Sequence, residues 1–156
     1  MPNLQPSYAT DYQTGYPGMV ANGETSNRIS RSVEDSAGLA FGRAAFRGAG
    51  DHGVTGTPAA NTFMGVVIAD LAIQPLAGVV AGGAAADIVP RYATAALMNE
   101  GVIWVTAGEN VADGDAAYVT SAGAWMKTAT SNTAVPAVFD DTAASGARVR
   151  LRVRRS

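Results

Sequence analysis

The chain has 156 residues, which is enough for one domain with a buried core of its own. It contains no Cys and a single His, His52, so disulfides, thiolate zinc sites, cysteine nucleophiles and a multi-His metal centre within one chain are all excluded. Charged residues make up only 15% of the chain and the net charge is −2, which argues against bulk binding of nucleic acid.

No segment has the pattern of a targeting signal or a membrane anchor. Residues Met1–Val20 contain neither a cationic residue nor an apolar run, so they do not read as a signal peptide. The longest uninterrupted apolar run, Leu76–Ala86, has 11 residues, whereas a bilayer-spanning helix needs about 20. We therefore expect a protein without membrane contact that is made in a reducing cytoplasm.

Residues 1–35 differ in composition from the rest and predict an extended N-terminal arm. Three prolines lie among Gly, Ser, Thr, Asn and Gln, and such a stretch is expected to sustain neither a helix nor a central strand. Tyr8, Tyr12 and Tyr16 are spaced four residues apart in it. The stretch is either a disordered terminus or an arm that becomes ordered on a partner, with the tyrosines as anchor residues.

From Gly38 onward the chain reads as short strands separated by turn signals. The predicted strands are Leu39–Phe46, Phe63–Ile73, Val102–Thr106, Ala117–Thr120, Trp125–Thr128, Val135–Phe139 and Arg148–Arg154. Leu76–Ala86 stays undecided between helix and strand, and Ala93–Met98 is either a helical turn or part of a strand. Pro136 predicts an edge strand or a bulge. Strands that recur about every ten residues predict a mainly β fold, an antiparallel sandwich or barrel.

The last predicted strand has the most regular pattern in the chain. A period of two places Val149, Leu151 and Val153 on one face of residues 148–154. The opposite face carries Arg148, Arg150, Arg152 and Arg154. Residues 100–141 hold six acidic side chains and one lysine, a net charge of −5.

This acidic region offers partners for the four arginines. We expect either cross-strand pairs with carboxylates of the same barrel, or pairs with a second subunit or another protein. Contact with RNA or DNA is a third alternative, but no aromatic residues interleave with the arginines to stack on bases.

Patterns that carry catalysis or bind cofactors are fragmentary. His52 lies between glycine-rich stretches and is expected in a surface loop. Gly78–Gly83 lacks the Lys-Ser/Thr ending of a phosphate-binding loop. Asp113-Gly-Asp115 predicts a turn rather than a calcium loop. Trp104 and Trp125 are expected to pack in the core. We therefore expect no enzyme activity, no cofactor and no metal site.

Five segments and a closing apolar strand follow one another in an order and spacing that can be compared with known families. The segments are Asp35–Gly48, Asn61–Ile68, Gly101–Val105, Gly114–Val119 and Gly123–Trp125. In their order and spacing they resemble the structural cement, or head-decoration, proteins of tailed bacteriophages. The resemblance covers residues 28–154 and rests on packing and turn residues.

The resemblance implies a non-enzymatic capsid component with a small β-barrel or jelly-roll-like domain, residues 36–156, after the arm of residues 1–35. Such a protein binds the major capsid protein on the outside of the shell, at junctions between subunits, as a homodimer or homotrimer. The resemblance further implies that the chain is a virion protein made in the cytoplasm of a bacterial host. The expected contact residues are Tyr8, Tyr12, Tyr16, Arg148, Arg150, Arg152 and Arg154.

Two other functions remain open from the sequence. One is a phage tail, baseplate or fibre-associated structural protein, which would be present in fewer copies per virion than a head-decoration protein. The other is a soluble ligand-binding β-barrel, for which a ligand would raise the melting temperature.

Overall fold

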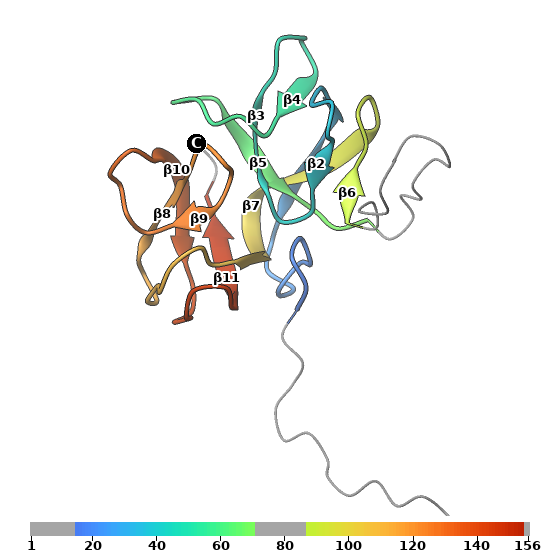
Figure 1. The fold of residues 1–156 in the computed structure, drawn as a ribbon. Helices are drawn as coiled ribbons and strands as arrows, with labels where there is room; N and C mark the ends of the chain where they lie inside the picture. Colours follow the sequence, from blue (N-terminus) through green and yellow to red (C-terminus); the bar gives the residue numbers. More distant parts are fainter. Residues whose placement is uncertain (1–14, 71–86, 155–156) are drawn as a thin grey trace, which may run out of the picture.

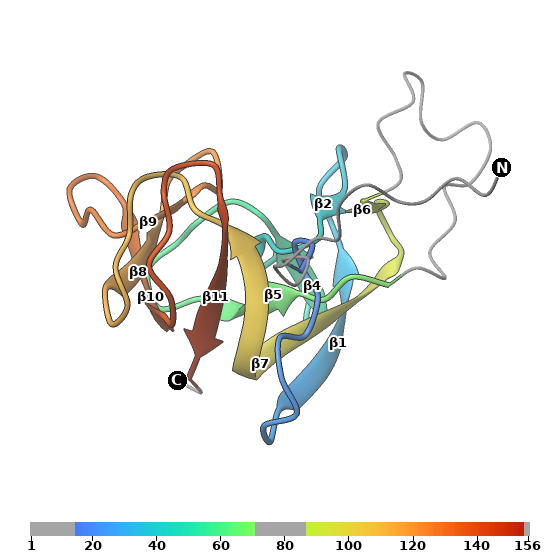
Figure 2. The same ribbon diagram turned by 90° about the horizontal axis from the view of Figure 1, so that it is seen from below.

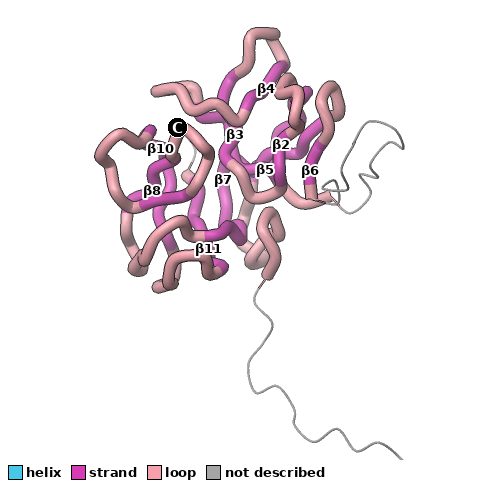
Figure 3. The backbone as a smooth tube through the Cα atoms, in the orientation of Figure 1, coloured by secondary structure: helices cyan, strands magenta, loops and turns pink. Residues whose placement is uncertain are grey.

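The computed structural model describes residues 15–70 and 87–154, and in these ranges every regular element is a β-strand (Figures 1 and 3). The strands are β1 (Asn27–Val33), β2 (Leu39–Ala40), β3 (Ala44–Arg47), β4 (Gly53–Thr55), β5 (Phe63–Val67), β6 (Ile88–Val89), β7 (Thr94–Thr106), β8 (Ala116–Val119), β9 (Trp125–Met126), β10 (Thr133–Phe139) and β11 (Arg148–Val153). A helix long and apolar enough to cross a membrane is absent from these residues.

Five strands close into a ring that we call the N-terminal barrel. Their order is β1-β4-β3-β5-β7, and β7 pairs with β1 to complete the ring. The β1–β4 pair is parallel, whereas the other four pairs are antiparallel. Closure matters because it gives each of the five strands a neighbour on both sides. Strands β2 and β6 form a separate antiparallel pair next to the barrel (Figure 1).

The remaining strands form a second unit that we call the C-terminal lobe. It consists of the last part of β7 followed by β11, β10, β8 and β9, all paired antiparallel. The lobe curls back on itself, because Trp125 of β9 forms a parallel bridge with Ala107, just after β7. The N–H of Gly108 donates to the Trp125 carbonyl at 2.7 Å and holds this contact.

Strand β7 belongs to both units and bends between them (Figure 2). Residues 94–98 pair with β1, whereas residues 101–106 pair with β11. Gly101 lies where the partners change, with a φ of 131°, and a Cβ there would come within 2.9 Å of the Cβ of Ser26. Glycine is required at this bend because it alone has both the backbone freedom and the small size.

The barrel wall between the two units is buried on both faces. Neighbouring residues of a strand point to opposite sides, so Val67 and Leu97 pack inside the barrel while Val66 and Met98 face the C-terminal lobe. These outward residues share a core with Phe139 and the other buried side chains of that lobe. The two units are therefore joined by a continuous apolar interface as well as by β7.

The strands predicted in the C-terminal third are confirmed, and the ends of four of them differ from the observed ends by at most two residues. The fifth, Val102–Thr106, is only the last part of β7, which begins eight residues earlier at Thr94. The pairing of β10 with β8 shifts register between Ala134 and Val138, so Pro136 marks a bulge. The edge alternative does not hold, because β10 pairs on both sides. Ala93–Met98, left open by its composition, is the first part of β7 apart from Ala93. The undecided stretch Leu76–Ala86 lies outside the described residues.

The mainly β fold is confirmed, and the barrel describes the topology, with one parallel pair that the sequence did not suggest. Within the stretch predicted as an arm, Asn27–Val33 forms β1 and pairs with both β4 and β7. The expectation that residues 1–35 sustain no central strand is therefore wrong for this part. The physical reason is local: the prolines and glycines end at Gly23, and Ile29, Arg31 and Val33 then alternate with residues of higher exposure.

Candidate interaction surface

The described N-terminal residues lie along β7 like a short added strand. Their contacts are the antiparallel bridge of Val20 with Ile103, and the bonds from Gly18 N to Trp104 O (2.7 Å), Trp104 N to Met19 O (2.8 Å) and Ala21 N to Val102 O (2.9 Å). We call residues 15–24 the anchored segment. It occupies the edge of β7 that β11 leaves free.

The anchored segment also contacts the N-terminal barrel, at Ala69 and Gly42. The Gly18 carbonyl accepts a bond from the N–H of Ala69 at 2.8 Å. A Cβ on Gly42 would lie 2.8 Å from the Cβ of Pro17 and 2.9 Å from the N of Gly18, and the φ of Gly42 is 72°. A larger residue at position 42 is therefore excluded by the closeness of the two backbones.

Arg148 fixes the beginning of the anchored segment. Its Nη1 donates to the Gly15 carbonyl at 2.8 Å. Gly15 lies directly on the Trp104 side chain, since a Cβ on Gly15 would come within 2.3 Å of Cδ1 of the indole. Arg148 of β11 and Trp104 of β7 thus both hold Gly15, the first residue of the anchored segment.

Arg150 pairs with Asp141 through a fork of two hydrogen bonds. Nε donates to Oδ2 at 2.7 Å and Nη2 to Oδ1 at 2.5 Å, with 39% and 29% of the two side chains exposed. The bonds from Arg150 lower the pKa of the Asp141 carboxyl, against the opposing effect of burial. The same contact raises the pKa of Arg150. Both groups are therefore charged at neutral pH.

Arg152 joins the anchored segment to the lobe. Its guanidinium donates to Glu24 at 2.6 and 3.2 Å and to Asp140 at 3.2 Å through both Nε and Nη2. The hydrogen bond from Arg152 lowers the pKa of Glu24, and the bonds to Glu24 and then Asp140 raise the pKa of Arg152. A single cation thus holds two carboxylates that lie 116 positions apart in the sequence (140 − 24).

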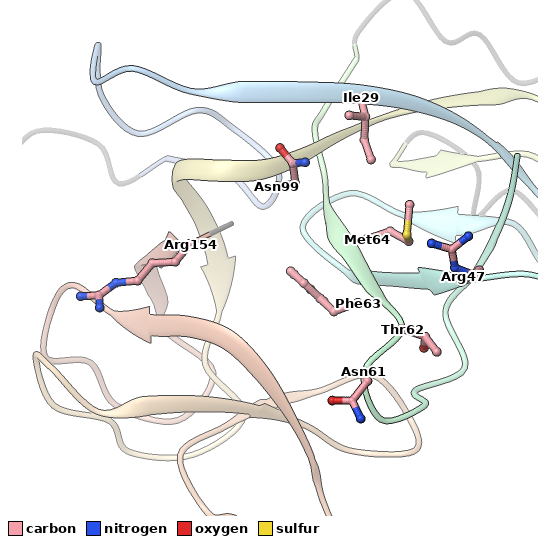
Figure 4. A pocket seen from close by; sticks show the side chains of 8 residues that line it. All are labelled: Ile29, Arg47, Asn61, Thr62, Phe63, Met64, Asn99 and Arg154. Carbon is pink, nitrogen blue, oxygen red and sulfur yellow. The ribbon is translucent and has the colours of Figure 1, made fainter. Parts of the chain in front are cut away.

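Arg154 differs from the other three arginines because its side chain makes neither a hydrogen bond nor an ion pair among the described residues, whereas Arg148 bonds the Gly15 carbonyl and Arg150 and Arg152 pair with carboxylates. It lies at the rim of a pocket between the two units (Figure 4). The pocket is lined by Ile29, Arg47, Asn61, Thr62, Phe63, Met64, Asn99 and Arg154. In Figure 4 the guanidinium of Arg154 points away from Phe63, and Arg47 lies at the opposite end. The two cations therefore do not converge on one point.

The structure brings one predicted tyrosine and three predicted arginines into one region. Tyr16 belongs to the anchored segment and is 41% exposed, next to the point held by Arg148. Tyr8 and Tyr12 lie outside the described residues. The sequence-based choice between pairs within one barrel and pairs between subunits resolves, for Arg150 and Arg152, to carboxylates of the same chain. A contact of these residues with another protein stays a prediction.

The sequence predictions for His52, the turn at 112–115 and Trp125 agree with the structure, whereas the expectation that Trp104 packs in the core is wrong. His52 is exposed in a turn, and the N–H of Asp115 donates to the Ala112 carbonyl at 3.1 Å, which closes the predicted turn. Trp125 is 2% exposed and donates from Nε1 to the Gly42 carbonyl at 2.8 Å. Trp104 is only partly buried. Within residues 15–70 and 87–154, no group of three acidic or histidine side chains is placed to hold a metal.

Two further carboxylates serve as acceptors for loop backbones. Glu34 accepts from the N–H groups of Ala49 and Gly50 at 2.8 Å, which lower its pKa. Glu109 accepts from the N–H groups of Lys127 and Thr128 at 2.7 Å, and the Thr128 bond contributes most to its lowered pKa. Each carboxylate fixes a turn that has no regular strand pairing.

Sequence reasoning missed the role of Glu24 and of the exposed Tyr92. Glu24 lies in the stretch predicted as an arm, where one acidic residue among polar ones gives no signal of a long-range pair. Tyr92 follows Pro90 and Arg91 directly, and proline is typical of turns, but nothing in the sequence indicates that the aromatic ring stays exposed.

The fold and the interaction surface together define a class: an all-β barrel protein whose arginines and carboxylates hold an N-terminal segment against a shared strand. The family model described as "Structural cement protein (E217 gp24/Pam3 gp6)" matches residues 4–154. The chain therefore belongs to the phage structural cement protein family, and it is a capsid-associated structural protein of the virion.

Among solved structures, a chain of a phage capsid shares this fold. A chain in the capsid of Myoviridae phage XM1 aligns with a TM-score of 0.64 at 20% sequence identity, over 96% of each chain. The N base of head fibre gp8.5 of bacteriophage phi29 aligns with a TM-score of 0.46 at 16% identity, over 85% of this chain and 97% of that one. No curated protein matches the chain.

Proposed function

We propose that this chain binds the outside of the phage capsid at junctions between major capsid protein subunits and stabilises the head. It acts as a non-enzymatic clamp, assembled as a homodimer or homotrimer. The observation that carries the proposal is the match of the structural cement family over residues 4–154. The likeness to a chain of the phage XM1 capsid supports the fold of such a protein.

The anchored segment supports a role for the N-terminal residues in this contact. Arg148, Arg152 and the backbone of β7 fix residues 15–24, so the preceding residues start from a defined point on the lobe. We propose that Tyr8, Tyr12 and Tyr16 are anchors on the capsid, because tyrosine offers a large contact area and a hydroxyl at low entropic cost.

The arginine face has two proposed roles. Arg148, Arg150 and Arg152 position the anchored segment and the loop after β10, and they contact a partner through the parts of their side chains that stay exposed. Arg154, which has no ion pair among the described residues, is available to a carboxylate of the capsid or of a second copy.

The mechanism is mechanical rather than chemical. A genome-filled head presses its subunits apart, and a protein that touches two neighbours resists their separation. Each contact requires little affinity, because a dimer or trimer engages several subunits at once and the second contact forms at high effective concentration.

The test is co-sedimentation of the purified protein with expanded cognate heads that lack it, scored as copies per capsid. We expect saturation at hundreds of copies for the full chain. Deletion of residues 1–14 leaves every described contact in place, so the melting temperature should change by less than about 2 °C. The half-saturating concentration should rise about tenfold or more, because the first two tyrosine anchors are lost.

The possible outcomes separate the alternatives. Only a few copies per particle would indicate a tail or fibre component and contradict the proposal. Equal binding by the full chain and the truncated chain would contradict the role of Tyr8 and Tyr12 while leaving the capsid role intact.

A further inference from the structure

Tyr92 is the large apolar side chain that protrudes most from the described surface. It is 75% exposed, compared with 41% for Tyr16 and 39% for Met19. It follows β6 in the turn that leads into β7. A ring that is 75% exposed buries little apolar surface on folding, so packing in the core does not explain its presence.

The backbone of Tyr92 is also strained. Its φ is 65°, in the left-handed region that favours glycine and, to a lesser extent, asparagine. Residues 90–93 form a tight turn, because the N–H of Ala93 donates to the Pro90 carbonyl at 3.1 Å. Tyr92 occupies the third position of this turn, where glycine would relieve the strain. The chain therefore keeps a bulky residue at a strained backbone position although its ring does not pack in the core.

The turn presents the ring on a rigid support. The N–H of Tyr92 donates to the Val33 carbonyl at 2.8 Å, which ties the turn to the end of β1. The guanidinium of Arg91 lies 4.6 Å from the centre of the Tyr92 ring and restricts its orientation. An oriented aromatic ring next to a cation has the composition of a binding hot spot, because few degrees of freedom are lost on contact.

We infer that Tyr92, with Arg91, is an anchor through which the chain contacts the capsid shell at a second point. This inference rests on the proposed function and names a part of its contact surface. The turn between β6 and β7 lies at the end of the barrel remote from the C-terminal lobe (Figures 1 and 2). The arginines of β11 that hold the anchored segment belong to that lobe.

Two separated contacts are what a protein that bridges neighbouring subunits requires. The partner surface that fits Tyr92 is an apolar depression with a carboxylate at its rim. The ring enters the depression, and the carboxylate pairs with Arg91.

The test uses Tyr92→Gly in the full chain, because this variant removes the ring and relieves the strain together. We expect the melting temperature to stay unchanged or to rise by up to about 5 °C. The half-saturating concentration for heads that lack the protein should rise about tenfold. The matched control is Ser131→Gly, at an exposed residue of the C-terminal lobe with a φ of 62°. This control should gain stability in the same way and bind heads as the unmodified chain does.

A photo-crosslinking variant, Tyr92→p-benzoylphenylalanine, identifies what the ring touches on decorated heads. We expect a product with the major capsid protein. The inference is overturned if Tyr92→Gly binds as well as the unmodified chain, if its melting temperature falls by several degrees, or if the crosslink joins two copies of this chain. In each of these cases binding by the unmodified chain keeps the proposed function, whereas its failure to bind heads would overturn both.

Discussion

The pair of Arg150 and Asp141 shows how one residue type at alternate positions of β11 organises its surroundings. The guanidinium presents two parallel donors, and the carboxylate of the loop after β10 accepts both. The Asp140 N–H in turn donates to the Arg150 carbonyl at 2.9 Å. Lysine in place of Arg150 would lack the planar fork, so this contact uses a property specific to arginine.

Asp141→Asn tests the energetic weight of this pair. Because the pKa of Asp141 is lowered in the folded state, the pair stabilises the protein above the unfolded pKa of 3.8, and the contribution disappears as the pH falls through the folded pKa. We expect Asp141→Asn to reduce the free energy of unfolding by about 1 kcal/mol at pH 7. The measurement is urea unfolding between pH 7 and pH 2.

The difference in free energy of unfolding between the unmodified chain and Asp141→Asn should shrink below pH 3.8 and vanish in strong acid. Asp113→Asn is the matched control, because Asp113 is exposed in a turn and its carboxylate makes no ion pair among the described residues. A difference for Asp141→Asn that stays constant with pH would show that the charge of Asp141 does not contribute.

At the scale of elements, the anchored segment depends on two glycines that let backbones approach. Gly18 and Gly42 face each other so closely that a Cβ on either would lie 2.9 or 3.0 Å from the backbone nitrogen of the other. At this point the segment therefore docks on backbone, whereas the side chains of Arg148 and Arg152 hold its two ends. This docking completes the pairing of the free edge of β7.

Gly42→Ala should loosen the anchored segment. The new methyl group would clash with Pro17 and Gly18, so we expect the N–H groups of Gly18 and Ala21 to lose about tenfold or more of their protection in hydrogen exchange. The free energy of unfolding should fall by about 1–3 kcal/mol.

The control for this variant is Gly114→Ala. Its φ is 87°, similar to the 72° of Gly42, but no atom lies within 4 Å of the added Cβ. It therefore carries the same backbone strain without the clash. Equal loss of protection at Gly18 and Ala21 in both variants would mean that strain, and not docking, is responsible.

The elements also show how far the sequence predicts this fold. Local patterns predicted three features correctly: the alternation in 148–154, the turn at 112–115 and the bulge at Pro136. Each of these features depends on residues that are neighbours in the chain. The parallel pairing of β1 with β4 and the continuity of β7 through Gly101 depend on residues distant in sequence, which a period of two does not specify.

The same limit applies to the candidate surface. The alternation predicted that the arginines share a face, and the acidic composition of residues 100–141 predicted Asp140 and Asp141 as possible partners. Glu24 was not predictable, because its pairing with Arg152 depends on how the anchored segment runs along the edge of β7. The left-handed φ of Tyr92 arises in a turn whose partner strand, β1, was assigned to the arm.

At the scale of the whole molecule, the two units share a strand and a core. They share β7, and Val66 and Met98 of the barrel pack in the same core as Phe139 of the lobe. The Nε1 of Trp125 adds a buried hydrogen bond across the interface, to Gly42. The proposed clamp would benefit from this arrangement, because force applied to one unit would be resisted by the core of both.

We therefore expect a single calorimetric transition whose van't Hoff and calorimetric enthalpies agree. Trp125→Phe should keep a single transition but lower the free energy of unfolding by about 2 kcal/mol, because the Gly42 carbonyl would remain buried without its donor. Trp104→Phe is the control, since the Trp104 indole N–H makes no hydrogen bond within the described residues and its removal leaves no such carbonyl. Two resolved transitions in the unmodified chain would show that the barrel and the lobe unfold independently. In that case the shared core would not transmit load between them, and the clamp would have to act through β7 alone.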